Sequence, residues 1–249
     1  MKILILIPDG VGIRNYLYSD LIKELRKNGT QICLYHKVSK DAIKEIEKVH
    51  ETEVQYIEIP NLKEGFYLRL LRESTSYARL IYFKNVLKNK TIINLWGKKP
   101  RGIKLRLFYF LCKFLGVLFS KNYNYIRKYE LKYEDKIRSV NAYQKAIEDL
   151  KELQPDFIIN LHQRAPITTS IILAAKDLKI KNSTVIFSWD NIPKGRLICR
   201  PDMYFVWSDL MKQQLCLLYK EVSPENVFVT GSPQFEFHTK KQFQQSKKD

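Results

Sequence analysis

Cysteine and histidine are scarce in this sequence, and neither falls into a motif. The 249 residues include four cysteines without a CxxC pair and four histidines without ligand spacing to one another or to the cysteines. This pattern excludes a disulfide scaffold and predicts no metal site. Free thiols in apolar surroundings are typical of a reducing compartment. The residues concerned are Cys33, Cys112, Cys199, Cys216, His36, His50, His162 and His238.

Glycine is sparse where a dinucleotide-binding loop needs it. The first apolar run, 2–8, is followed by Gly10 and Gly12, which make only a GxG. The third glycine of the dinucleotide fingerprint is missing, and the second apolar run ends at His36 and Lys37 where an acidic residue is needed. We therefore expect no bound NAD and no other cofactor.

No apolar run is long enough to cross a bilayer, which takes about 20 residues. The run at 2–8 turns directly into Asp9 and Gly10 without a small-residue cleavage site, so it predicts a strand and not a signal peptide. A longer apolar stretch at 104–120 contains Lys113 near its middle. Its length and flanking cations favour a helix lying at a membrane surface, with a buried core helix as the alternative.

Acidic residues are rare in one third of the chain. Residues 61–140 hold 19 Lys and Arg against 5 Asp and Glu, so +14 of the total charge of +17 is concentrated there. A local basic field attracts an anionic membrane, nucleic acid or an acidic substrate. The alternative is a solvated helical face.

What is present is an alternation of strands and helices. Apolar runs at 2–8, 30–36 and 53–60 are separated by amphipathic helices at 16–27 and 39–50. After residue 153 the rhythm resumes, with strands predicted at 156–162, 183–189, 203–208 and 226–231 and helices at 167–178 and 209–220. This order predicts an α/β fold with a Rossmann-like parallel sheet covered by helices on both faces.

The sequence divides into three predicted parts. Residues 1–60 and 154–238 form the Rossmann-like domain, and 61–153, which shows no strand pattern, forms a basic helical insertion. Residues 239–249 have no apolar periodicity and are expected to be a frayed tail or the start of a linker.

Ligands of open parallel sheets bind beyond the carboxyl ends of the strands. Three predicted loops lie there, and each also fits an ordinary strand-to-helix turn or a structural histidine. Their candidate substrate-binding or catalytic residues are Gly10, Gly12, Arg14 and Asn15 in the first loop, His162, Gln163 and Arg164 in the second, and Trp189, Asp190, Asn191 and Lys194 in the third.

A combination of motifs resembles a known family. SWDN, KGR and RPDMYFVWS precede a helix and then NVFVTGSPQFEFH, whose Gly231, Ser232 and Pro233 form a turn after a strand. Together with the first glycine loop, these segments resemble the N-terminal, acceptor-side domain of bacterial GT-B glycosyltransferases of surface-polysaccharide and cell-envelope pathways, in the UDP-glycosyltransferase/glycogen phosphorylase-like superfamily. The sequence ends shortly after this turn.

The resemblance implies an acceptor-binding half of a glycosyltransferase. Such a domain binds a glycan or lipid-linked acceptor, and a separate C-terminal domain or partner chain binds the nucleotide-sugar donor, so this chain alone is expected to be inactive. A base must deprotonate the acceptor hydroxyl, and Asp190 and then His162 are the candidates.

A lipid-linked acceptor fits a peripheral position at the cytoplasmic face of the cell membrane. Cations in and around 104–120 are the predicted membrane contacts, namely Lys98, Lys99, Arg101, Lys104, Arg106, Lys113 and Lys121. The rival hypothesis is a non-enzymatic basic module that binds membrane or nucleic acid, the latter through tyrosines interleaved with lysines at 123–133. Tyr125, Tyr129 and Tyr133 fall on one helical face, which favours packing over base stacking.

Overall fold

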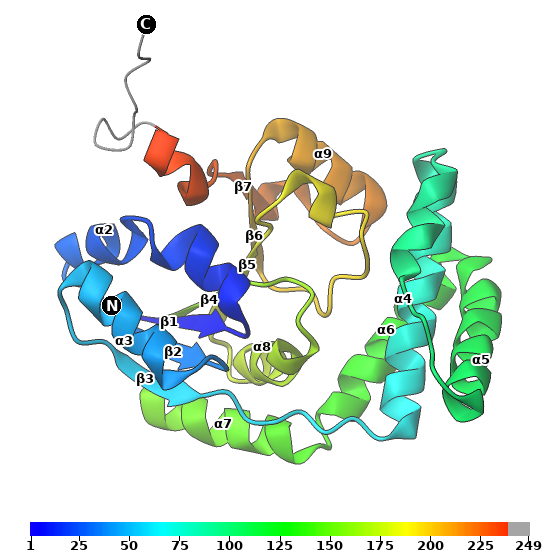
Figure 1. The fold of residues 1–249 in the computed structure, drawn as a ribbon, viewed down its shortest axis with the longest axis horizontal. Coiled ribbons are helices and arrows are strands. Elements are labelled where there is room, and N and C mark those ends of the chain that lie inside the picture. Colours follow the sequence, from blue (N-terminus) through cyan, green and yellow to red (C-terminus); the bar gives the residue numbers. More distant parts are fainter. Residues whose placement is uncertain (239–249) are drawn as a thin grey trace, which may run out of the picture.

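The computed structural model describes residues 1–238, and the tail predicted at 239–249 lies outside them. A seven-stranded parallel sheet runs through the molecule in the order β3-β2-β1-β4-β5-β6-β7 (Figure 1). The predicted fold class is confirmed. The strands are β1 (Lys2–Ile7), β2 (Gln31–His36), β3 (Gln55–Glu58), β4 (Phe157–Asn160), β5 (Lys181–Val185), β6 (Met203–Val206) and β7 (Val227–Val229).

Helices cover both faces of the sheet, because β1 sends alternate apolar side chains to each. Ile5 packs on one face with Ile22 and Ile43 of the N-terminal helices, whereas Leu4 packs on the other with Leu150. The first face carries α1 (Gly10–Gly12), the π-helix η1 (Ile13–Leu17), α2 (Leu21–Lys27) and α3 (Lys40–His50), and the second carries α7 (Asn141–Leu153) and α8 (Thr169–Asp177).

Helices fill the segment between β3 and β4. A close approach joins α4 and α5, since a Cβ added at Gly116 would lie 2.9 Å from the carbonyl oxygen of Ser74. The helices before α7 are α4 (Phe66–Val86), the 3-10 helix η2 (Lys90–Trp96), α5 (Ile103–Ser120) and α6 (Tyr123–Ile137). The last helix, α7, leads into β4, and its apolar side chains lie in the same buried cluster as those of β1. The segment 61–153 therefore packs directly on the sheet.

A buried ion-pair network ties these helices to the C-terminal half of the sheet. Glu130 of α6 accepts hydrogen bonds from Nε and Nη2 of Arg79 on α4, both at 2.7 Å, and from Nη2 of Arg200 at 2.8 Å. Nε of Arg200 also donates to Glu221 at 2.6 Å, just beyond α9 (Asp209–Leu218). Burial opposes ionisation of Glu130, but Arg200 and Arg79 lower its pKa to about 2.

Most predicted elements differ from the observed ones by a few residues at their ends, and two of them change more. The helix expected at 16–27 starts earlier and is divided into η1 and α2, because Tyr18 donates to the carbonyl of Ile13 and the Ser19 hydroxyl to that of Tyr16. The strand expected at 183–189 ends at Val185, and the chain beyond it turns into the short 3-10 helix η4 (Trp189–Asn191).

Candidate active site at the switch in strand order

The strand order reverses between β1 and β4, and the loops that follow these two strands diverge at that point. In open parallel sheets this divergence creates a crevice at the carboxyl ends of the strands. Asp9 follows β1 and His162 follows β4. Nδ1 of His162 hydrogen-bonds Oδ2 of Asp9 at 2.5 Å, so the sheet topology brings together two residues far apart in the sequence.

Neighbouring groups fix both members of the Asp9–His162 pair. Asp9 caps α1 by accepting a hydrogen bond from the Val11 amide at 3.0 Å. Asn160, at the end of β4, accepts from the His162 amide and donates to the His162 carbonyl, both at 3.2 Å. The ring of Phe187 packs edge-on against the imidazole. The histidine is therefore positioned by β4, β1 and the loop after β5.

The electrostatics of the pair suit a general base. Burial raises the pKa of Asp9, but the hydrogen bond and charge of His162 and the amides of α1 outweigh it and hold that pKa below its usual value. The ionised carboxylate accepts the Nδ1 proton, which leaves the lone pair on Nε2 of His162. Within residues 1–238 that Nε2 has no hydrogen-bond partner, and the imidazole is 16% exposed.

Asp190, the first candidate base from the sequence, uses both of its carboxylate oxygens in contacts within its own loop. Oδ1 accepts a hydrogen bond from the Ser188 hydroxyl at 2.6 Å, and Oδ2 pairs with the ammonium of Lys194. Although burial raises it, these two groups hold the pKa of Asp190 below its usual value. A carboxylate held ionised by a lysine is a weak base for a sugar hydroxyl.

The first loop places its predicted residues in different settings. Gly12 is buried, and a Cβ there would lie 2.9 Å from Cβ of Leu161, so this glycine lets α1 pack on the end of β4. Gly10 is exposed with open space around it. Nε of the exposed Arg14 donates to the buried side chain of Asn15 at 3.3 Å.

The other two loops carry buried polar groups without partners. Both side-chain polar atoms of Gln163 and Nδ2 of Asn191 lack a hydrogen-bond partner among the described residues, although each side chain is only 3% exposed. Arg164 is half-buried, and Trp189 is 68% exposed. Buried amides in this state are frequent where a ligand or ordered water completes a site.

The predicted turn after the last strand returns to this edge of the sheet. Gly231 has φ +71°, and Pro233 starts the 3-10 helix η6 (Pro233–His238), which lies beside η1. Burial raises the pKa of Tyr16 in η1, and the nearby Ser232 of this turn offsets only part of that rise. Figure 1 shows η6, in red, next to the blue N-terminal segment that carries the first loop, as the contact between η6 and η1 requires.

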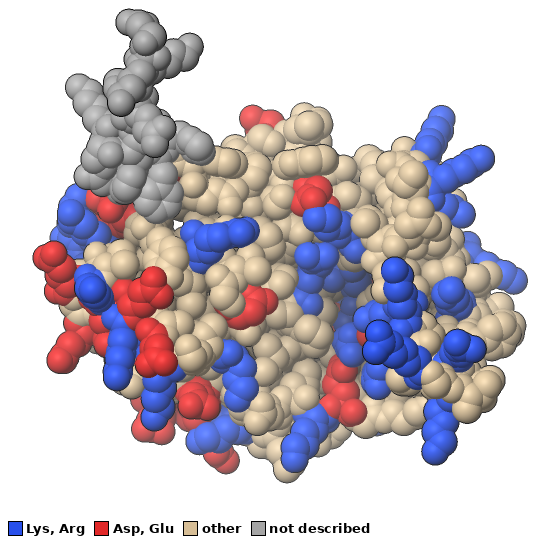
Figure 2. All heavy atoms as spheres, in the orientation of Figure 1, with Lys and Arg blue, Asp and Glu red and all other residues tan. Residues whose placement is uncertain are grey.

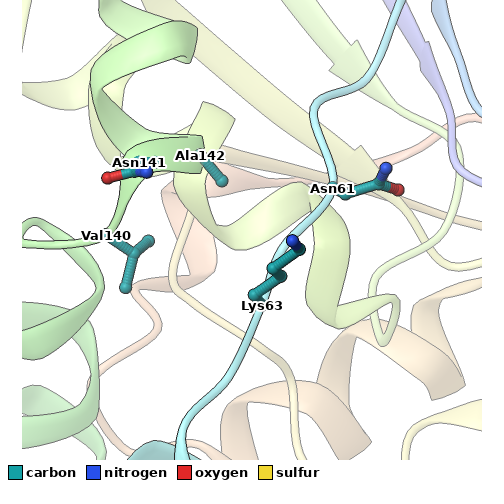
Figure 3. A pocket seen from close by; sticks show the side chains of 5 residues that line it. All are labelled: Asn61, Lys63, Val140, Asn141 and Ala142. Atoms are coloured by element: carbon teal, nitrogen blue, oxygen red, sulfur yellow. The ribbon is translucent and has the colours of Figure 1, made fainter.

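A separate hollow lies between the segment after β3 and the start of α7 (Figure 3). Its volume is about 350 Å³, with Asn61 and Lys63 on one side and Val140, Asn141 and Ala142 on the other. Lys63 is the one charged residue among its lining side chains. Without an acid–base pair, this hollow is a weaker candidate than the crevice at β1 and β4.

The predicted membrane contacts lie on one side of the molecule. All seven cations are exposed, and Figure 2 shows Lys and Arg gathered over α4 and α5, whereas Asp and Glu are frequent on the opposite side. Within the described residues, no helix is long and apolar enough to span a bilayer. Tyr133 is fully buried and Tyr129 stacks on Phe119, so two of the three interleaved tyrosines are used in packing.

Asp9 was not among the residues singled out from the sequence. An Asp-Gly pair directly after a buried strand is the signal that could have marked it, but turns use the same pair. Its function as the partner of His162 depends on β1 and β4 being neighbours. Among residues 1–238 no group of His, Cys, Asp and Glu could hold a metal ion.

No known family model matches the chain, and no curated protein does. The structure is similar to a UDP-GlcNAc 2-epimerase from Neisseria meningitidis, with a TM-score of 0.48 and 14% identity over 95% of this chain and 47% of that one. It is also similar to a glycosyltransferase from Rickettsia africae ESF-5, with a TM-score of 0.46 and 14% identity over 92% of this chain and 42% of that one. The chain thus spans about half the length of these proteins, and at such identities the similarity concerns the fold alone.

Proposed function

We propose that this chain is the acceptor-side half of a glycosyltransferase, with His162 as the base and Asp9 as its partner. The observation that carries the proposal is the Asp9–His162 hydrogen bond at the switch in strand order. The motif resemblance of the sequence to GT-B acceptor domains points the same way. The nucleotide-sugar donor is then bound by a second domain, on the same polypeptide or on a partner chain.

The chemistry assigned to the pair is a single proton transfer. As the acceptor hydroxyl attacks the anomeric carbon, Nε2 of His162 takes its proton and the sugar–phosphate bond breaks. The imidazolium that forms is stabilised by the ionised carboxylate of Asp9. His162 replaces Asp190 as the first candidate, since Lys194 and Ser188 already occupy the Asp190 carboxylate.

The test is transferase activity of the chain together with its donor-binding domain. His162→Asn is expected to lower kcat by about 100-fold or more, with little change in KM for the donor, because a base contributes about 10²–10⁴ to the rate. Asp190→Asn is the matched comparison and is expected to lose less. A His162→Asn enzyme that keeps more than a tenth of the kcat would refute the assignment.

We also propose that α5 docks this half on an anionic membrane. Six large apolar side chains of α5 project together into solvent, although the helix packs on α4 through Cys112 and Gly116. Arg106 and Lys113 border this exposed stripe. The stripe consists of Ile103, Leu107, Phe110, Phe114, Val117 and Leu118, which are between 38% and 70% exposed. An apolar stripe with a cationic border is the pattern of an interfacial helix.

Cosedimentation with liposomes tests the docking. The chain is expected to bind vesicles that contain about one third anionic lipid more tightly than neutral vesicles. Added salt should weaken its binding to the anionic vesicles. The double variant Phe110→Ser/Phe114→Ser should bind vesicles less at every salt concentration. Leu217→Ser, which removes an exposed apolar side chain from α9, is the control and should bind like the wild type. Indifference to lipid, combined with tight nucleic-acid binding, would instead support the non-enzymatic basic module.

A further inference from the structure

A second pocket adjoins the loops of the candidate active site. Its volume is about 210 Å³, and it lies between the insertion and the two loops that carry Arg164 and Lys194. The lining residues are Arg72, Glu73, Ser76, Leu80, Leu95, Trp96, Lys98, Arg164, Pro166, Lys194, Gly195, Arg196 and Ile198. Arg164 follows His162 by two residues, so one wall of the pocket belongs to the loop that carries the proposed base.

The pocket is strongly cationic, and only some of its positive side chains have a carboxylate partner. Glu73 is the one carboxylate among its lining residues, and it pairs with Arg72 at 2.7 Å and Lys98 at 3.4 Å. Lys194 pairs with Asp190. Arg164 and Arg196 form no ion pair with any residue that the structure describes. Two positive charges of the pocket are therefore left without a counter-charge in contact.

The unpaired polar atoms of the pocket are all hydrogen-bond donors. Within residues 1–238, Nε1 of Trp96, Nε of Arg164 and both Nε and Nη2 of Arg196 are buried without a partner. Arg196 is 3% exposed and Trp96 is 8% exposed, so water reaches neither side chain freely. Leaving a buried donor unsatisfied is unfavourable, because the donor has lost its hydrogen bonds to water. A ligand that supplies only acceptor oxygens removes this cost.

Other buried arginines of the chain show how a compensated guanidinium differs. Arg79 and Arg200 both donate hydrogen bonds to Glu130. Burial alone would lower the pKa of each arginine, but the charge of Glu130 outweighs it and raises that pKa. Burial instead lowers the pKa of Arg164 and Arg196, and nearby acidic groups such as Asp190 and Glu130 offset this only in part. The same fold thus pairs two buried arginines and leaves two facing one pocket.

We propose that this pocket binds a phosphate group of the acceptor. A phosphate monoester carries a charge near −2 and only acceptor oxygens, which matches the two uncompensated guanidinium groups and the four unpaired N–H donors. The inference rests on the proposed function, since it assigns the acceptor to a phosphate-bearing class. A phosphate bound there contacts Arg164, in the loop that carries His162, and lies near Lys98, one of the predicted membrane contacts.

Binding of inorganic phosphate to the purified chain tests the pocket directly, by calorimetry and by thermal shift. Phosphate is expected to bind the wild type and to raise its Tm. Arg164→Gln should weaken binding by about tenfold, as expected for a charge-assisted hydrogen-bonded pair. Lys23→Gln on α2 also removes one positive charge, at an exposed position outside the pocket and the α5 stripe, and should leave binding unchanged. Arg196→Gln is not used, because this residue is almost fully buried.

Two ligands then identify the source of the phosphate. A hexose 1-phosphate and a short-chain prenyl phosphate in neutral micelles are titrated separately, and tighter binding of the prenyl compound indicates a lipid-linked acceptor. Equal losses in Arg164→Gln and Lys23→Gln, or no phosphate binding at all, would overturn the proposal. His162→Asn should retain phosphate binding, so failure of the catalytic assignment and failure of the pocket are distinguishable.

Discussion

Replacing Glu130 with glutamine removes the buried anion that holds α4, α6 and Arg200 together. The fall in the Glu130 pKa from 4.5 to about 2 corresponds to about 3 kcal/mol at neutral pH, since each tenfold change in proton affinity is worth about 1.4 kcal/mol. Breaking a buried ion pair by removing one partner typically costs about 3–5 kcal/mol. We therefore expect Glu130→Gln to lower the free energy of unfolding by roughly 3 kcal/mol.

The assay is urea unfolding of the wild type and Glu130→Gln between pH 3.5 and pH 7, with the exposed Glu152→Gln as control. Because the folded pKa lies below the unfolded one, the stabilisation is complete above about pH 5 and is lost as the pH falls through 4.5 toward 2. The difference between wild type and variant should shrink by about 1 kcal/mol between pH 5 and pH 3.5. A difference below about 1 kcal/mol at pH 7, or one that does not change with pH, would refute the reasoning.

Two further predictions concern close helix contacts. Gly12→Ala puts a Cβ 2.9 Å from Leu161 and is expected to destabilise the chain by about 1–3 kcal/mol in urea unfolding, whereas Gly10→Ala has open space and should change stability little. Equal effects would contradict the packing of α1 on β4. Gly116→Ala places a Cβ 2.9 Å from the Ser74 carbonyl and is expected to lower Tm despite the better helix propensity of alanine; an unchanged or higher Tm would show that α5 can move away from α4 at no cost.

Much of the fold can be predicted from local sequence patterns. Continuous apolar runs such as 2–8 identify buried parallel strands, and the alternation with amphipathic helices predicts the sheet class. The loops at Gly10, His162 and Asp190 could be located because each follows a predicted strand. The excess of cations in 61–140 and the apolar stretch at 104–120 likewise come from composition alone.

Tertiary structure decided which of these residues act together. His162 pairs with Asp9 because β1 and β4 are neighbours in the sheet. The Asp190 carboxylate instead forms an ion pair with Lys194, four residues later in the same loop. A periodic pattern records which face of an element is buried, but it does not record strand order. The pairing of Arg79 with Glu130 also depends on how α4 and α6 pack, and within residues 1–238 Arg196 has no such carboxylate partner. The sequence by itself therefore determined the elements and the loops, and the packing of distant segments determined the pairing of His162 with Asp9, which carries the proposed function, and the cationic pocket.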